Sequence, residues 1–246
     1  MHIARSLLVL SLAVPLFADP IGDVRAALAK LTAQQPIRAT YELQHSVVSE
    51  GKFDNDKFSG KAVVGLESDG GEVRIILPKV LLEQVSREHQ ARTTNVETPT
   101  PTANALAEID TVETSNALDC APMLLRLIHG AKLLSDAQGT FQGKPVRVLV
   151  LRVEDRIEKE DKGRVKMGEN KLTLWLGPDL VPVGAEHLVN AKISVLFLKA
   201  ESKQKKSWYF TQVADRLVRV RHESTQSGSG MGQKSNETVI STVRVH

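Results

Sequence analysis

The chain has little cysteine and few aromatic residues. Cys120 is the one cysteine among 246 residues, so no internal disulfide can form and stability must come from the core. Free cysteines are commonly buried, so we expect Cys120 to be a small buried residue; no histidine motif beside it would activate a reactive thiol. Aromatic residues make up 4% of the chain and the formal net charge is +3. Both values argue against a nucleic-acid partner.

Long apolar runs are absent after the N-terminus. Arg5 is followed by the apolar segment Leu7–Phe17 and by the small residue Ala18, which together are typical of an export signal. This run is too short to span a membrane comfortably, since a span needs about 20 residues. The pattern predicts a signal peptide over residues 1–18 and a periplasmic or secreted mature chain without a transmembrane segment.

Motifs for catalysis, metal binding and cofactor binding are also missing. Glu186-His187 and His222-Glu223 lack the second histidine of a zinc-protease motif, and we expect His187 on a solvated strand face. The glycines around Gly228 lack the residues that complete a phosphate-binding loop. Asp54-Asn55-Asp56 lacks the spacing of a calcium loop and is interpreted as a polar loop. The sequence predicts no catalytic residue, no metal and no cofactor.

The first third of the chain changes from helical to strand periodicity. Asp19-Pro20 is a capping residue followed by a proline that fits the first helical turn. Ser68–Gly71 is a hairpin signal between two strands. The apolar stripe of the predicted helix consists of Ile21, Val24, Leu28 and Leu31. The predicted strands begin at Ile37, Lys61 and Val73.

Helical patterns follow in the middle of the chain. Lys79–Arg92 predicts a helix with Val80, Leu81 and Val85 facing inward. Prolines among threonines then predict a break over residues 93–102. A second helical region over residues 103–128 is divided by Pro122.

The last part of the chain predicts only strands. Leu172–Val189 is a strand, a tight turn and a second strand, in which Leu172, Leu174 and Leu176 share one face. The other expected segments are strands at Lys132–Phe141, Val146–Val153 and Val239–Val245, a charged loop at Asp155–Asn170, a basic turn at Lys203–Lys206 and a flexible link at Ser227–Gly232.

This order of elements predicts an α+β fold. Residues 19–246 are expected to form a single domain, with a large curved antiparallel sheet whose concave face is covered by helices. Such an interior either packs solid or holds an apolar ligand.

The same order resembles the LolA/LolB-like superfamily of periplasmic lipoprotein carriers. The matching pieces are Asp23–Leu43, Ala121–Leu125 and the hairpin at Leu172–Val183. The resemblance implies an incomplete β-barrel with a helical lid that binds acyl chains in its interior. The ligand-binding residues expected in that interior are Tyr41, Leu43, Val73, Ile75, Leu81, Met123, Leu124, Leu127, Leu172 and Leu174.

Three functional hypotheses follow. The first is an exported, non-enzymatic protein that holds a lipid, a lipoprotein acyl chain or another amphiphile between the sheet and the lid helices, Lys79–Arg92 and Ala103–Ile128. The second is a packed envelope interaction domain without a small ligand, which would bind envelope proteins through exposed strands such as Val239–Val245. The third is an exported hydrolase whose acids and histidines meet only in space.

Overall fold

The computed structural model describes residues 19–51, 55, 57–155, 163–195, 198–230 and 232–246. Residues 1–18, where we predict a signal peptide, and Asp54 and Asp56 of the polar loop lie outside these ranges. The described helices are α1 (Pro20–Leu28), α2 (Lys79–Thr94), α3 (Pro101–Ala107), α4 (Thr111–Leu118) and α5 (Ala121–Ile128). The strands are β1 (Ile37–Gly51), β2 (Lys57–Ser68), β3 (Val73–Ile76), β4 (Lys132–Phe141), β5 (Lys144–Arg152), β6 (Val165–Leu176), β7 (Pro182–Val195), β8 (Leu198–Val213), β9 (Arg216–Gly230) and β10 (Gln233–Val245).

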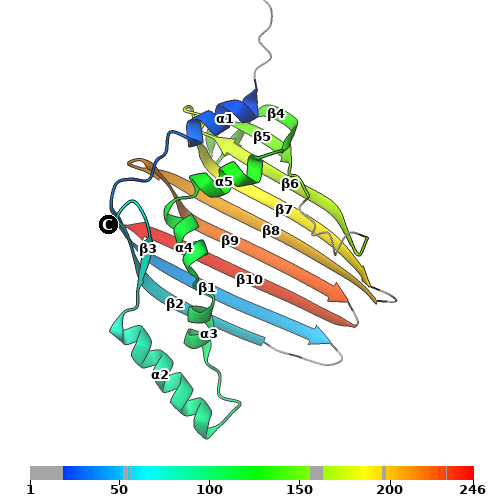
Figure 1. Ribbon diagram of the computed structural model, residues 1–246. Coiled ribbons are helices and arrows are strands. Elements are labelled where there is room, and N and C mark those ends of the chain that lie inside the picture. Colours follow the sequence, from blue (N-terminus) through cyan, green and yellow to red (C-terminus); the bar gives the residue numbers. More distant parts are fainter. Residues whose placement is uncertain (1–18, 52–54, 56, 156–162, 196–197, 231) are drawn as a thin grey trace, which may run out of the picture.

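The ten strands of the described residues form one antiparallel sheet in the order β3-β2-β1-β10-β9-β8-β7-β6-β5-β4. β10 lies between β9 and β1, and its register runs from Ala39 opposite Val245 to Gly51 opposite Gln233. β3 and β4 are the two edges, so the sheet is curved but not closed. The helices α1, α3, α4 and α5 cover its concave face (Figure 1). The predicted α+β fold is therefore confirmed.

Two hydrophobic cores fill the space between the sheet and these helices. In the first core, α1 and α5 pack on β5 to β9; in the second, α3 and α4 pack on β1, β2 and β10. Leu172, Leu174 and Leu176 are buried side by side in the first core, as their alternation predicted. Cys120 is fully buried there, and burial raises the pKa of its thiol to about 12. It behaves as the small apolar residue that the sequence predicted.

Local signals place the helices that cover the face. The Asp19 carboxylate accepts a hydrogen bond from Gly22 N at 2.9 Å, and Pro20 occupies the first turn of α1. Asp110 caps α4 in the same way, because its carboxylate accepts from Glu113 N at 2.7 Å. Pro122 lies in the first turn of α5, so the predicted division is confirmed, although residues 103–128 contain an additional break at Asp110. No helix in the described part of the chain is long and apolar enough to cross a membrane.

The helix predicted at Lys79–Arg92 is confirmed as α2, and Leu81 is buried as predicted, but its place in the fold and the inward position of Val80 were predicted wrongly. α2 lies beyond the edge formed by β2 and β3 rather than over the concave face (Figure 1). Only Leu81 and Glu88 are buried along it, and Val80 is 69% exposed. Among the described elements α2 contacts mainly the short helix α3, and this contact includes hydrogen bonds from Thr102 N and Ala103 N to the buried Glu88 carboxylate. The helices over the concave face are therefore α3 to α5 and α1.

Several predicted loops are strands. The basic segment Lys203–Lys206 lies in the middle of β8, and the expected link Ser227–Gly232 contains the end of β9, with Met231 outside the described residues. Within the predicted charged loop, β6 already begins at Val165. Val239–Val245 belongs to β10. Its residues 239–242 pair with both β1 and β9 and so cannot add a partner strand, and residues 243–245 pair with β1. Polar segments extend these strands because neighbours satisfy their backbone groups on both sides.

Candidate functional site

Two cavities with shared walls lie on the concave face. The larger has a volume of about 450 Å³ and lies against α4 and α5; the smaller, of about 200 Å³, lies against α4 and the residues before it. Glu113 of α4 and Gln204 and Lys206 of β8 line both cavities. We call the two cavities together the concave groove. A third hollow of about 720 Å³ lies between the Ser68–Gly71 turn and α4, and its lining combines small residues with the charged side chains Glu72, Asp119, Arg126 and Arg216.

The larger cavity combines apolar and polar side chains. Met123 and Leu127 contribute apolar atoms from α5, and Val189 contributes them from β7. Asn170 of β6 and His187 of β7 contribute polar atoms. A lining of this kind is typical of sites that bind a small molecule with an apolar body and a polar group.

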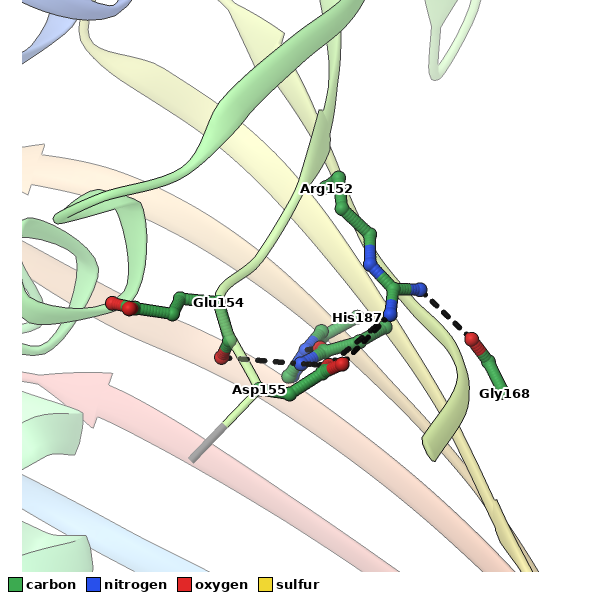
Figure 2. Close-up of polar contacts among 6 residues, drawn as sticks. Arg152, Glu154, Asp155, Gly168 and His187 are labelled. Carbon is green, nitrogen blue, oxygen red and sulfur yellow. Dashed lines mark hydrogen bonds and ion pairs between the residues drawn. The ribbon is translucent and has the colours of Figure 1, made fainter. Parts of the chain in front are cut away.

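His187 is held by a chain of hydrogen bonds across β5, β6 and β7 (Figure 2). The amide nitrogen of Asn170 donates to the Asp155 carboxylate at 3.0 Å, and Arg152 donates to the same carboxylate at 2.9 Å. The amide oxygen of Asn170 therefore faces His187 Nε2, at 2.7 Å. Because an amide oxygen only accepts, Nε2 carries the proton and Nδ1 carries the lone pair.

The imidazole of His187 is also the end of a row of three rings. The rings of His187 and Trp208 have centroids 6.4 Å apart, and those of Trp208 and His222 are 6.1 Å apart; both pairs are stacked. The three residues come from β7, β8 and β9, so the row crosses the strands. We call it the ring row. His187 and Trp208 line the larger cavity and His222 lines the smaller one.

Both histidines of the ring row are neutral at physiological pH. Burial, with a smaller contribution from the charge of Lys206, lowers the pKa of His187 to about 4. Burial and the charges of Arg219 and Lys206 lower the pKa of His222 to about 3. Each imidazole therefore offers one N–H donor and one lone pair.

Several buried nitrogens near the groove lack a hydrogen-bond partner among the described residues. They are His45 Nδ1, Trp208 Nε1, Arg219 Nε and His222 Nε2. Buried polar atoms without partners are rare in folded proteins. His45 is partly compensated, because its Nε2 lies 2.9 Å from the Glu237 carboxylate.

The wall of the groove nearest to β1 and β9 is held by an ion pair. Arg219 is 1% exposed, and its guanidinium lies 2.8 Å from the carboxylate of Glu113, which fixes α4 to β9. Tyr41 hydrogen-bonds to Ser241, but burial outweighs this bond and raises the pKa of the Tyr41 hydroxyl. Tyr41 is therefore a neutral part of the wall.

The predicted ligand-binding residues are divided between the cavities and the cores. Tyr41 and Leu43 line the smaller cavity, and Met123 and Leu127 line the larger one. Val73 lines the third hollow. Leu124, Leu172 and Leu174 are buried in the first core, whereas Leu81 is buried in the second and Ile75 packs against it.

Sequence reasoning missed the polar part of the groove. His187 was expected on a solvated face but lines the larger cavity. Gln204 and Lys206 were predicted to lie in a turn. A strand that began before Trp208 would have placed Gln204 and Lys206 on the same face as Trp208, because side chains two residues apart share a face. The described residues contain no cluster of three or more histidine, cysteine or acidic side chains suited to a metal.

No protein-family model matches the chain, and a search of curated proteins finds no match either.

Proposed function

We propose that this protein is an exported, non-enzymatic carrier that holds an amphiphile, such as a lipid or an acyl chain, in the concave groove. The observation that carries the proposal is the larger cavity. Its volume of about 450 Å³ lies in the range of about 300–1,000 Å³ found for small-molecule sites, and its lining is both apolar and polar. Arg5 and the apolar run after it, read as an export signal, support an envelope location.

Binding is favoured over catalysis by the surroundings of His187. Its Nε2 proton is donated to Asn170, and in the described part of the chain no serine or cysteine hydrogen-bonds to the imidazole. A general base needs a nucleophile or a water within hydrogen-bond reach of its lone pair. The network of Asn170 and Asp155 gives His187 a fixed orientation, which suits recognition of a ligand.

The proposal is tested by native mass spectrometry of the full-length chain, expressed in a Gram-negative host and purified without detergent. We expect a mass excess that is released as a lipid or acylated species on activation. Met123→Trp, which fills the larger cavity, should reduce uptake of added lipid about tenfold or more. Leu134→Trp, at a position 58% exposed on the edge strand β4, is the matched control and should leave uptake unchanged.

A clean apo mass with no uptake from added lipid would overturn the carrier proposal. Equal loss of uptake in both tryptophan variants would also contradict it, because the site would then lie outside the concave groove.

A further inference from the structure

Two buried nitrogens of the ring row lie beside the groove without a protein partner in the described part of the chain. Trp208 is 4% exposed and His222 is 7% exposed, and neither Trp208 Nε1 nor His222 Nε2 has a hydrogen-bond partner among the described residues. An indole nitrogen can only donate. Trp208 lines the larger cavity and His222 lines the smaller one, and the centroids of their rings lie 6.1 Å apart.

Lys206 adds a positive charge to the same groove. It lines both cavities, and its charge lowers the pKa values of His187 and His222. Its sequence neighbour Lys205 forms an ion pair with Glu186, whereas Lys206 has no ion pair with any residue that the structure describes. A lysine without an acidic partner beside neutral donors is suited to binding an anion.

Four acidic side chains line the smaller cavity with Lys206, and one of them, Glu108, has its carboxylate 3.8 Å from His45 Nδ1. Glu113 pairs with Arg219 at 2.8 Å, and Glu237 lies 2.9 Å from His45 Nε2. Asp110 accepts the hydrogen bond that caps α4. Among the described residues, none of these four carboxylates forms an ion pair with Lys206.

We propose that the ring row and Lys206 bind the anionic oxygen head group, a carboxylate or a phosphate, of a single-chain amphiphile. Lys206 supplies the charge, and Trp208 Nε1 and His222 supply hydrogen bonds. Met123 and Leu127, on the same cavity, contact the acyl chain. The volume of the larger cavity lies in the lower half of the usual range, which favours one chain over several. This inference rests on the proposed function and adds the class of head group to it.

The test compares ligands that share one chain and differ in the head group. Delipidated full-length protein is loaded with the neutral dye N-phenyl-1-naphthylamine, which is then displaced by oleate, oleyl phosphate, oleyl alcohol or methyl oleate. We expect at least one of the anionic ligands to bind about tenfold more tightly than the alcohol and the ester, as a charge-assisted hydrogen bond implies.

Variants test which residues cause the preference for anionic ligands. Lys206→Gln should bring the anionic and neutral ligands to within about threefold of each other. Lys203→Gln is the matched control, because Lys203 lies on the same strand at the opposite alternation and is exposed, and it should retain the preference. Trp208→Phe keeps an aromatic ring but removes the N–H donor, so it should weaken the anionic ligand and spare the alcohol. It also provides a second test if Lys206→Gln does not fold.

The outcomes separate the two proposals. Binding of all four ligands with equal affinity would overturn the head-group assignment and leave the carrier function intact. Binding of none would overturn the carrier function itself. A preference for anions that survives both Lys206→Gln and Trp208→Phe would place the head group elsewhere and overturn this inference. The ratio of oleate to oleyl phosphate identifies which anion is preferred.

Discussion

The buried histidines of the ring row line the groove and also make the stability of the fold depend on pH. Folding removes His187 and His222 from water, and the nearby cations Lys206 and Arg219 disfavour their protonation further. The folded protein therefore holds both rings as neutral donors at physiological pH. The same environment makes protonation of these residues a route to unfolding in acid.

The first prediction concerns the pH dependence of stability. The folded pKa values, about 4 for His187 and about 3 for His222, lie below the unfolded value of about 6.5. Between these values the unfolded chain binds more protons, so stability falls as the pH drops from about 6.5 toward 4 for His187 and toward 3 for His222. Urea unfolding midpoints at pH 7, 5.5 and 4.5 measure the slope.

A substitution tests whether His222 causes this pH dependence of stability. His222→Phe keeps a ring beside Trp208 but cannot titrate, so it should flatten the slope between pH 6.5 and 4.5. His89→Phe, at an exposed position on α2, should leave the slope as it is in the wild type. An unchanged slope in His222→Phe would contradict the assignment.

At the scale of elements, one carboxylate fixes α2 to the helix that follows it. Glu88 is buried, and its carboxylate accepts hydrogen bonds from Thr102 N and Ala103 N at 3.0 Å each, and from the Gln84 amide at 3.1 Å. Burial alone would raise the pKa of Glu88, but these hydrogen bonds outweigh it and lower the pKa. Glu88, a residue of α2, therefore caps the N-terminus of α3.

The second prediction is that Glu88→Gln loosens α2. We expect a loss of about 1–2 kcal/mol in the free energy of unfolding, as for other lost helix caps, and faster amide exchange across residues 79–94. Glu83→Gln is the control, because Glu83 forms only an exposed pair with Lys79 at 3.6 Å, and such pairs contribute little. Equal exchange rates in the two variants would contradict the capping role.

Elements with an apolar face could be predicted from the sequence, whereas polar ones could not. α1 and the Leu172–Leu176 strand were found because one side of each is buried in the first core. The outer halves of β8 and β9 are polar, and they remain strands because each pairs with neighbours on both sides. That pairing depends on the whole sheet and cannot be predicted from a short segment of sequence.

The candidate site follows the same rule. Met123 and Leu127 of α5 were predicted in the groove because their spacing of four residues places them on one face of a helix. Asn170, His187 and Lys206 were missed because polar residues were expected in solvent. What brings them together is the order of β6, β7 and β8 in the sheet, and that order depends on pairings between distant parts of the chain.

At the scale of the whole molecule, the two cores are joined at one seam. On β9, Leu217 belongs to the first core and its neighbour Val218 to the second. On the helical side, Leu118 belongs to the second core and Cys120 to the first. The backbone N–H of Cys120 donates to the carbonyl of Leu217 at 2.8 Å, so the helices and the sheet are connected where the cores meet.

The third prediction is that the two cores unfold as one cooperative unit. Leu174→Ala in the first core and Leu66→Ala in the second should each cost about 2–5 kcal/mol, because both side chains are 1% exposed. Differential scanning calorimetry should show one transition in each variant, shifted down by about 2–4 °C per kcal/mol. Leu134→Ala, at an exposed position on β4, should leave the transition unchanged. Two separate transitions, with only one of them shifted by each core variant, would mean that the seam does not couple the cores and that the helices could leave the concave groove without unfolding the sheet.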